Sequence, residues 1–473
     1  MNQNIIIERL KASLGLDIAT SKIVVVGLGV TGFSIATYLA NLGFDFVVAD
    51  SRGQSSVISQ LQETLGNMTV FSGAFDEDLF SNASHLIVSP GIPLTEKAIA
   101  KAVSNGTKII GDIDLFACST DAPIVAITGS NGKSTVTTLL GEMAKAAGKR
   151  VGVGGNLGVA ALDLLDESAN LYVLELSSFQ LERTSQLNAT AATVLNISAD
   201  HLDRHADIAD YAVQKQRVFI GDGVMVINVD DPVVLDMHEK GRSTVTFSIQ
   251  TIADFCIGKD NDLEYLKRGE KALMPLSELP LEGRHNAANA LAALALGAAV
   301  DLDEQAMCKA LKAFNGLPHR MQRVTEIAEV TWVNDSKATN IGACIAALQG
   351  YEHKVILIAG GDAKGADMRD LIPTIKEKTK AVVLMGKDAE LIEQAINGCV
   401  PVHNCSTMQQ AVVVAASIAT GGDTVLLSPA CASLDQYKNY QDRGDQFAQA
   451  VMGLADSNHN CDGAASRSSR MIV

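Results

Sequence analysis

Aromatic residues are scarce in this chain of 473 residues: Phe, Trp and Tyr together make up 4%, whereas apolar residues make up 47%. Aliphatic side chains must therefore fill the cores. The eight cysteines contain no CxxC pair, which favours free, buried thiols over disulfides or a zinc site. Positive charge is also in short supply, because 38 basic residues face 54 acidic ones, a net charge of −16. A field of that sign repels nucleic acid and anionic membranes, so neither is an expected partner.

Long hydrophobic runs are missing as well. The longest run of small apolar residues, ALAALALGAAV at 290–300, is well short of the roughly 18 residues that a membrane span needs. The segment MNQNIIIERLKASLG has no charged stretch followed by a long apolar one, so no secretory signal is expected. These features predict a cytoplasmic protein.

Short apolar segments alternate with helix-like segments through most of the chain, as in KIVVVGL, PIVAITG, LYVLELS and KVILIAGG. Near-continuous apolar strands between amphipathic helices indicate parallel sheets covered on both faces. The length suggests about three domains. We therefore expect an α/β protein with a Rossmann-like domain over 1–111, a central P-loop ATPase-like domain with a mostly parallel sheet over 112–316, a second Rossmann-like domain over 317–455 and a disordered tail over 456–473.

The segment ITGSNGKSTV, residues 127–136, has the order of a P-loop: strand, glycine turn, lysine, hydroxyls and helix. In such a loop the backbone N–H groups point at an anion, the lysine reaches phosphate oxygens and a hydroxyl can ligate Mg²⁺. The turn is tighter than in the common pattern. The alternative is a glycine turn that merely enters a helix. The expected phosphate-binding residues are Gly129, Ser130, Asn131, Gly132, Lys133, Ser134 and Thr135.

Three further residues suit nucleotide chemistry. Glu175 ends the strand LYVLELS and His201 follows ATVLNIS, and ligands gather at the carboxyl ends of parallel strands. Both could ligate a metal ion, with a strand cap and a loop histidine as the alternatives. Lys215 is either a lysine that snorkels to water or a desolvated amine that can add CO₂, and the resulting carbamate could bridge two Mg²⁺. Its predicted helical face contains Ile208, Tyr211, Ala212, Val218 and Phe219.

A second glycine motif lies earlier, where KIVVVGLGVTGFS contains G-x-G-x-x-G after a strand and Asp50 closes the next strand. On this motif alone NAD is favoured, but UDP also has a pyrophosphate and a ribose. Towards the C-terminus, polar loops follow three predicted strands in VNDSKATN, GGDAKGAD and LLSPACASLDQYKNYQDRG. Lys337 and Lys364 there suit carboxylates or phosphates, although such a lysine is usually just solvated.

Jointly, TGSNGKST, YVLELSSFQLE, LPHR, NDSKATN and SPACASLDQYKN resemble the Mur ligases, the ATP-dependent amide-forming enzymes of peptidoglycan precursor synthesis. The resemblance runs from Lys22 to about residue 452. Its C-terminal motif favours the branch that adds D-glutamate to UDP-N-acetylmuramoyl-L-alanine. It implies that ATP phosphorylates the carboxylate of the nucleotide substrate and that the amine of D-glutamate then expels phosphate through a tetrahedral intermediate. A monomer with two Mg²⁺ ions is expected.

The resemblance also implies a role for each matched residue. Lys133 would hold the γ-phosphate, Ser134 and Glu175 one Mg²⁺, and His201 with carbamylated Lys215 the second. The remaining ATP and active-site residues would be Asn286, Asn289, His319, Arg320 and Asp335. The nucleotide substrate would contact Val30, Thr31, Asp50, Ser51, Arg52, Ser89, Gly91 and, near the metals, Asn156. The D-glutamate pocket would comprise Lys337, Thr339, Ser433, Leu434 and Tyr440, and Asp362 and Lys364 would lie at the domain interface near the acceptor site.

Other classes of protein stay open at this point. Sister ligases that add L-alanine, a diamino acid or glutamate to folate differ from the favoured branch only in the amino acid or the acceptor. An NAD(P)-dependent oxidoreductase would explain the first glycine motif, but it leaves the P-loop, Glu175 and Lys215 unexplained. A non-catalytic P-loop regulator is the third hypothesis.

Overall fold

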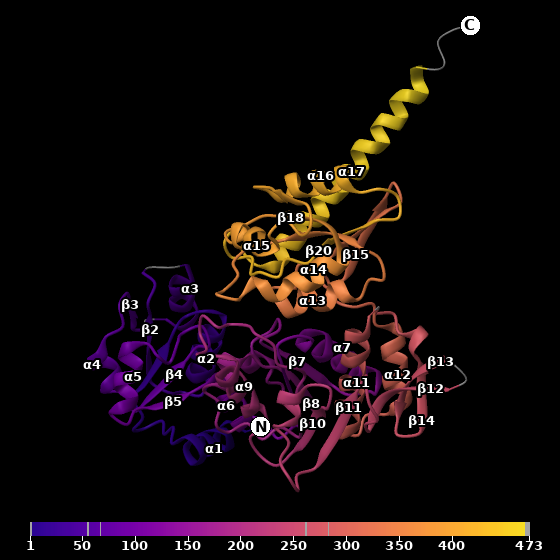
Figure 1. The fold of residues 1–473 in the computed structure, drawn as a ribbon. Coiled ribbons are helices and arrows are strands. Elements are labelled where there is room, and N and C mark those ends of the chain that lie inside the picture. Colours follow the sequence, from indigo (N-terminus) through magenta and orange to yellow (C-terminus); the bar gives the residue numbers. More distant parts are fainter. Residues whose placement is uncertain (1, 54–55, 67, 261–262, 282, 469–473) are drawn as a thin grey trace. The chain divides into compact units, whose positions relative to one another are not determined.

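The structure is a computed structural model that describes residues 2–53, 56–66, 68–260, 263–281 and 283–468. The chain divides into two compact units. Unit 1 comprises Met1–Ile197, Ala209–Pro280 and Asn286–Phe314, and unit 2 comprises Ser198–Ile208, Leu281–His285 and Asn315–Val473. Unit 1 carries two sheets and unit 2 carries one, each with helices packed on it, as the predicted α/β class requires (Figure 1).

The first sheet of unit 1 is parallel, with the strand order β3-β2-β1-β4-β5. Its strands are β1 (Ile23–Val26), β2 (Phe46–Asp50), β3 (Val70–Ser72), β4 (His85–Val88) and β5 (Lys108–Ile110). Successive side chains of β1 enter two different apolar clusters, with Val24 on one face and Val25 on the other, so both faces are covered. The helices are α1 (Gln3–Leu14), α2 (Val30–Asn41), α3 (Ser56–Leu65), α4 (Glu77–Ser81), α5 (Lys97–Ser104) and α6 (Asp112–Cys118).

The second sheet of unit 1 has the order β14-β13-β12-β11-β10-β9-β6-β8-β7. It is parallel from β7 to β12, and β12, β13 and β14 form an antiparallel edge that the sequence did not predict. Its strands are β6 (Ile124–Thr128), β7 (Val151–Gly155), β8 (Leu171–Glu175), β9 (Ala191–Val194), β10 (Val224–Asn228), β11 (Thr244–Ser248), β12 (Phe255–Asp260), β13 (Leu263–Arg268) and β14 (Lys271–Pro275).

The α-helices of this region are α7 (Lys133–Ala146), α8 (Ser178–Leu181), α9 (Ile208–Gln216), α10 (Pro232–Leu235), α11 (Arg284–Ala299) and α12 (Glu304–Ala313). Short 3-10 helices are η1 (Ala161–Leu164), η2 (Arg217–Phe219) and η3 (Leu276–Glu278). One apolar cluster runs from Val25 through Phe116 to Tyr172, and the last two rings meet edge to face with centroids 5.0 Å apart. The two sheets of unit 1 therefore share a continuous core.

The sheet of unit 2 has the order β15-β16-β20-β17-β18-β19, in which β15 pairs antiparallel and the others pair in parallel. Its strands are β15 (Gln322–Ile327), β16 (Val330–Asn334), β17 (Val355–Ala359), β18 (Thr379–Leu384), β19 (Val402–Asn404) and β20 (Thr424–Leu427). Its helices are α13 (Ile341–Gln349), η4 (Met368–Leu371), α14 (Ile372–Lys378), α15 (Ala389–Ile396), α16 (Met408–Ile418) and α17 (Tyr440–Ser468).

The expected disorder of the tail over 456–473 stays a prediction. The backbone of α17 continues as helix to Ser468, because a helix that is already nucleated extends at low cost. The rest of the tail, 469–473, lies outside the described residues. The domain boundaries themselves stay predictions.

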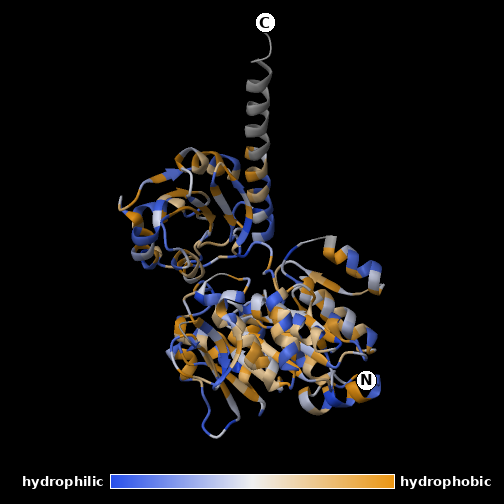
Figure 2. Ribbon diagram, turned by 90° about the vertical axis from the view of Figure 1, so that its right-hand side faces the viewer, coloured by the Kyte–Doolittle hydropathy of each residue, from blue (hydrophilic) through white to orange (hydrophobic). Residues whose placement is uncertain are grey.

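Hydropathy and cysteine burial follow the expected pattern in most places. Hydrophobic residues run along the strands of unit 1 in Figure 2. Cys399 is an exposed free thiol, contrary to the expectation of burial, whereas the fully buried free thiols are Cys118, Cys256, Cys344 and Cys431. Within the described residues, none of the helices has both the length and the apolar character that crossing a membrane requires.

Candidate active site

The candidate phosphate-binding loop joins β6 to α7. Gly129 and Gly132 have φ angles of 143° and 88°, which residues with a side chain rarely adopt. A Cβ atom at Gly132 would also lie 2.4 Å from Asn289 Oδ1, so glycine is needed there on two counts. Because α7 begins directly afterwards at Lys133, its first turn presents backbone N–H groups and the positive end of the helix dipole. This arrangement fits the P-loop interpretation.

Lys133 and Asn196 organise this loop. Lys133 Nζ donates to the carbonyl oxygens of Gly129 and Ser130, each at 2.8 Å. The side chain of Asn196 accepts from Asn131 N–H at 2.8 Å and donates to the Asn131 carbonyl at 3.1 Å. The Asn196 carbonyl accepts from Ser130 N–H at 2.9 Å. Asn196 is not among the predicted residues, although its place just after β9 was an available signal.

Oxygen atoms without hydrogen-bond partners are buried near the loop. Glu175, 3% exposed at the end of β8, accepts from Asn156 Nδ2 at 2.8 Å through Oε1. Within the part of the chain that the structure describes, Glu175 Oε2 and Thr135 Oγ1 have no hydrogen-bond partner. Such atoms are costly unless a ligand or water satisfies them, and oxygen is the donor that Mg²⁺ prefers. These residues and the neighbouring Ser134 therefore fit a divalent metal.

Helix α9 carries Lys215 into the interior, where the residue is 1% exposed. Its Nζ lies 3.3 Å from Thr128 Oγ1 and 4.5 Å from the centroid of the Tyr211 ring. The alternative of a lysine that snorkels to water is therefore wrong. Ile208 does not share the buried face, because it starts the helix and is 43% exposed, whereas the other predicted members are buried: Tyr211, Ala212, Val218 and Phe219.

His201 belongs to unit 2 with the segment Ser198–Ile208, and its φ angle is 56°. The adjacent Asp200 accepts from Lys364 Nζ at 2.5 Å and from Asn340 Nδ2 at 3.0 Å. Among the described residues, no group of three or more His, Cys, Asp or Glu side chains is arranged to hold a metal ion. The other predicted metal ligands lie in unit 1: Ser134, Glu175 and Lys215.

Two predicted ATP contacts lie on α11 beside the P-loop. Asn286 and Asn289 are buried, and Asn289 Nδ2 donates to Asn286 Oδ1 at 3.3 Å. The close approach of Asn289 to Gly132 brings it to the loop, as the resemblance implies. The other two predicted ATP contacts belong to unit 2: Arg320 and Asp335.

Unit 2 gathers polar side chains where β16 and β20 end. Asp335 accepts from Ser428 Oγ at 2.9 Å and from Met321 N–H at 3.2 Å. Burial raises the pKa of Asp335 to about 6. His319 Nδ1 lies 3.1 Å from Asn334 Nδ2, and burial lowers the pKa of the imidazole. The neutral imidazole of His319 is thus favoured near neutral pH, whereas the neutral form of Asp335 is favoured only below about pH 6.

Two residues of the predicted amino-acid pocket, Lys337 and Tyr440, are in contact in unit 2. Lys337 Nζ lies 3.2 Å from Tyr440 Oη and 4.9 Å from the centroid of that ring. The buried Arg443, which the sequence did not point to, donates to the carbonyl oxygens of Ser336 at 2.8 Å and Cys431 at 3.1 Å. It thereby joins the two loops that carry the pocket. The other predicted residues on these loops are Thr339, Ser433 and Leu434.

The loop of Asp362 and Lys364 is tied to the same region. The backbones of Asp362 and Ala432 exchange two hydrogen bonds, at 3.0 and 2.8 Å. Asp362 Oδ1 accepts from Lys364 N–H at 2.9 Å, and Asp362 Oδ2 accepts from Lys387 at 3.2 Å. The structure therefore brings together the loops after β16, β17 and β20, which carry the three polar motifs.

In the first domain, Asp50 organises the loop after β1. Its carboxylate accepts from Leu28 N–H at 2.5 Å and from Arg52 Nε at 2.8 Å. Burial raises the pKa of Asp50, but these hydrogen bonds outweigh it and the net pKa is below the ordinary value. Ser89 Oγ donates to the Gly27 carbonyl at 2.6 Å. Asp50 and Ser89 thus shape the glycine loop itself.

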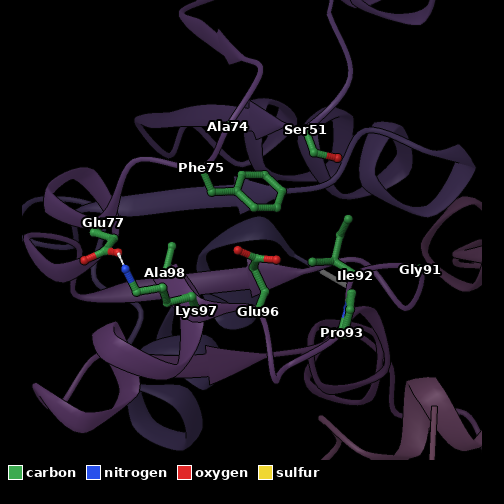
Figure 3. Close-up of a pocket in the computed structure, with 10 residues that line it drawn as sticks. All are labelled: Ser51, Ala74, Phe75, Glu77, Gly91, Ile92, Pro93, Glu96, Lys97 and Ala98. Atoms are coloured by element: carbon green, nitrogen blue, oxygen red, sulfur yellow. Dashed lines mark ion pairs between the residues drawn. The ribbon is translucent and has the colours of Figure 1, made fainter. Parts of the chain in front are cut away.

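A cavity of about 460 Å³ opens next to this loop (Figure 3). Ser51 and Gly91 line it, and Lys97 forms an ion pair with Glu77 at 2.7 Å on its wall. The other lining residues are Ala74, Phe75, Ile92, Pro93, Glu96 and Ala98. The predicted nucleotide contacts that do not line this cavity are Val30, Thr31, Asp50, Arg52, Ser89 and Asn156.

Parallel α/β sheets, a P-loop and a buried carboxylate beside it place the chain in the class of P-loop nucleotide-binding proteins. Sequence models place it more narrowly: a MurD-like Mur ligase N-terminal domain matches residues 21–111, the Mur ligase middle domain 127–297 and the Mur ligase glutamate ligase domain 319–431. The chain belongs to the Mur ligase family. It is therefore an ATP-dependent amide ligase, and the oxidoreductase alternative is not favoured.

Individual relatives agree with this assignment. A UDP-N-acetylmuramoylalanine--D-glutamate ligase of Methylococcus capsulatus is 52% identical over 93% of this chain and 96% of its own. The ligase of the same name from Marinobacter nauticus is 47% identical over 93% of this chain and 100% of its own. The solved structure of UDP-N-acetylmuramate-alanine ligase from Thermotoga maritima shares the fold, with a TM-score of 0.57 and 16% identity over 93% of this chain and 100% of its own.

Proposed function

We propose that this enzyme joins D-glutamate to UDP-N-acetylmuramoyl-L-alanine and forms ADP and phosphate. The observation that carries the proposal is the 52% identity, across 93% of the chain, to a ligase named for this reaction. The glutamate ligase domain match over 319–431 includes Lys337 and Thr339 of the predicted amino-acid pocket, which supports an amino-acid substrate there.

The P-loop would serve the first chemical step, transfer of the γ-phosphoryl group to the substrate carboxylate. A carboxylate is a poor electrophile, and phosphorylation supplies a leaving group. The two reactants are both anions, so the positive end of α7 and Lys133 lower the cost of bringing them together. In this conformation Lys133 bonds to loop carbonyls, and it would exchange these bonds for phosphate oxygens.

The metal sites are also part of the proposal. Ser134 and Glu175 would hold one Mg²⁺, and His201 with carbamylated Lys215 a second. When bound, the metal screens phosphate charge. The orphan Oε2 of Glu175 supports the first site. Asn156 donates to the other oxygen and fixes the orientation of the carboxylate.

Burial of Lys215 supports the carbamate, because a desolvated amine is more often neutral and only the neutral amine attacks CO₂. We expect Lys215→Ala to lower kcat at least about 100-fold, with partial rescue by short-chain carboxylic acids that replace the missing carbamate. Turnover equal to that of the wild type without any added acid would rule the carbamate out. The measurement is phosphate release with and without acetate or propionate.

The sugar-nucleotide substrate would bind the first domain, and D-glutamate the predicted pocket of Lys337, Thr339, Ser433, Leu434 and Tyr440. A lysine and a hydroxyl beside an aromatic ring suit the two carboxylates and the short aliphatic chain of glutamate. We further propose a cytoplasmic monomer without a nucleic-acid or membrane partner, which agrees with the net charge of −16.

The decisive assay is phosphate release from ATP and UDP-N-acetylmuramoyl-L-alanine with Mg²⁺ across a panel of L- and D-amino acids. We expect turnover with D-glutamate and at least 100-fold less with L-glutamate, L-alanine or a diamino acid. Lys133→Ala should abolish phosphate release if the P-loop is catalytic. Lys145→Ala, on the exposed side of α7, is the matched control and should not. Another preferred amino acid would overturn the substrate assignment, and no amide product would overturn the function.

A further inference from the structure

A buried arginine, Arg183, reaches from the central region of unit 1 to the first domain. It follows α8, and its side chain is 0% exposed. One guanidinium nitrogen donates to the Ser89 carbonyl at 2.8 Å, and another donates to the Ile92 carbonyl at 3.2 Å. The second nitrogen also forms an ion pair with Glu182 at 2.9 Å. Burying a charged side chain is costly unless it is paired and hydrogen-bonded, and these bonds from the two terminal nitrogens offset part of that cost.

The segment that Arg183 holds is a turn. Ile92 N–H donates to the Ser89 carbonyl at 3.0 Å, the same oxygen that accepts from Arg183. Ser89 Oγ donates to the Gly27 carbonyl at 2.6 Å. A Cβ atom at Gly27 would lie 2.6 Å from Ile92 Cγ1, so the glycine loop and the turn are in close contact. A shift of the turn would therefore shift the glycine loop as well.

This turn borders the cavity of the first domain. Gly91, Ile92 and Pro93 form one side of the cavity in Figure 3, opposite Phe75. The turn and the glycine loop contain predicted sugar-nucleotide contacts, whereas Arg183 is in neither. Arg183 is thus placed behind the site rather than in it.

The surrounding chain is shaped to admit this arginine. A Cβ atom at Gly111, at the junction of the two domains, would lie 2.8 Å from Arg183 Cγ. The next residue, Asp112, is fully buried and accepts from Gln180 Nε2 at 2.9 Å. Gln180 belongs to the capping box of α8 with Ser177, two residues after Glu175. A short rigid segment therefore connects the end of β8 to the turn.

We propose that Arg183 is a positioning residue for the uridine diphosphate part of the substrate: by holding the two carbonyls of the Ser89–Ile92 turn, it sets the shape of the nucleotide site from behind. The assignment rests on the proposed function for the identity of the substrate. The chemistry that it concerns, recognition of a nucleoside diphosphate, is narrower and can be tested with UDP alone.

The test compares Arg183→Met, which keeps the stem but loses every donor, with Arg183→Lys, which keeps one charged donor group. We expect Arg183→Met to raise the KM for UDP-N-acetylmuramoyl-L-alanine at least tenfold, with kcat and the KM values for ATP and D-glutamate within about twofold of the wild type. The KM of Arg183→Lys for the nucleotide substrate should lie between those of the wild type and Arg183→Met. Calorimetric titration with UDP should show the same order of Kd values.

Arg242→Met is the matched control. Arg242 also donates to two main-chain carbonyls, those of Gly223 and Phe219, but it lies away from the turn. It should lower Tm without changing the KM for the nucleotide. The proposal would be overturned if Arg183→Met lowered Tm and left the KM for the nucleotide unchanged. Equal changes in all three KM values would also overturn it. If Arg183→Met does not fold, the UDP titration of Arg183→Lys decides. A Kd for UDP equal to that of the wild type would then contradict the proposal.

Failure of this inference can be separated from failure of the proposed function. A wild-type protein that makes no amide product refutes the proposed function, whatever Arg183 does. A wild-type protein that makes the product, with variants that bind UDP equally well, refutes only the role of Arg183.

Discussion

At Glu175 one carboxylate oxygen accepts a hydrogen bond from Asn156, while the other has no partner among the residues that the structure describes. Replacing the carboxylate with an amide tests whether charge is needed at that atom. Because Glu175→Gln keeps the shape and removes the negative charge, we expect the Mg²⁺ concentration for half-maximal phosphate release to rise roughly tenfold or more. The measurement is a Mg²⁺ titration at saturating ATP.

Glu142→Gln serves as the control, since Glu142 is half exposed on α7 and pairs with Lys145. Its Mg²⁺ dependence should match that of the wild type. An unaltered Mg²⁺ dependence in Glu175→Gln would remove this residue from the metal site.

Asp335 predicts a pH dependence of stability. Burial raises its pKa from 3.8 to about 6, so between these values the folded protein binds more protons than the unfolded chain. The stability contributed by this group is therefore greatest below about pH 4 and is lost as the pH rises through 6. The asparagine side chain of Asp335→Asn does not titrate in this range. The stability of the variant relative to the wild type should therefore rise by roughly 2–3 kcal/mol between pH 4 and 7. Urea unfolding at several pH values measures it.

The opposite slope is expected at Asp423 in the same unit. Burial raises the pKa of Asp423, but the hydrogen bonds from Lys380, at 2.6 Å, and from Thr420, together with the lysine charge, outweigh it and the net pKa is lowered. Its contribution is lost as the pH falls, so Asp423→Asn should cost stability at pH 7 and less at pH 4. If the stability of both variants, relative to the wild type, changed with pH in the same direction, burial would not be what sets the pKa of Asp335.

Which residues the sequence can reveal depends on how local their signal is. Lys133 and Glu175 stand at fixed offsets from a strand end, so the motif alone points to them. Asn196, Arg183 and Arg443 act on carbonyls or amides of segments far away in the chain, and only the fold shows these contacts. The alternative of a solvated Lys215 failed for the same reason, because helical periodicity does not show what covers a face.

At the scale of elements, the start of α2 depends on a close approach. A Cβ atom at Gly32 would lie 1.9 Å from the Gly27 carbonyl and 2.8 Å from Ser89 Oγ. Because backbone cannot yield as a flexible side chain does, we expect Gly32→Ala to destabilise the protein by about 3 kcal/mol or more. It should also weaken UDP binding. Thermal unfolding and UDP titration measure the two effects.

Gly29, three residues earlier, offers the matched control. A Cβ atom there would have no heavy atom within 4 Å, and its φ angle of −82° is open to alanine. Gly29→Ala should change the free energy of unfolding by less than about 1 kcal/mol. Equal destabilisation by both substitutions would mean that packing at Gly32 is not what requires glycine.

Several of the strands that the sequence predicts are buried on both sides. β1, β6, β8 and β17 are short, continuous apolar runs, and all are fully buried. The antiparallel edge of β12, β13 and β14 lacks that pattern because LEYLKR and KALMP mix charged and apolar residues at a partly exposed edge. An edge strand depends more on pairing with its neighbouring strand than on burial. A search for continuous apolar runs therefore misses it.

At the scale of the whole molecule, the proposed reactants are divided between the two units. The P-loop, Glu175 and Lys215 lie in unit 1, whereas His201 and the predicted amino-acid pocket lie in unit 2. Amide formation needs the acyl phosphate and the amine within bonding distance, so turnover requires one defined arrangement of the units. Binding energy from ligands on both units can select that arrangement.

Small-angle X-ray scattering tests this requirement. We expect the radius of gyration to decrease when ADP, Mg²⁺, the nucleotide substrate and D-glutamate are present together, towards the value of about 23 Å that compact packing gives for a chain of this length. Each ligand alone should produce a smaller decrease, because it contacts one unit. The sample without D-glutamate isolates the contribution of unit 2. A radius that stays constant under every combination would mean that the ligands do not select an arrangement of the units.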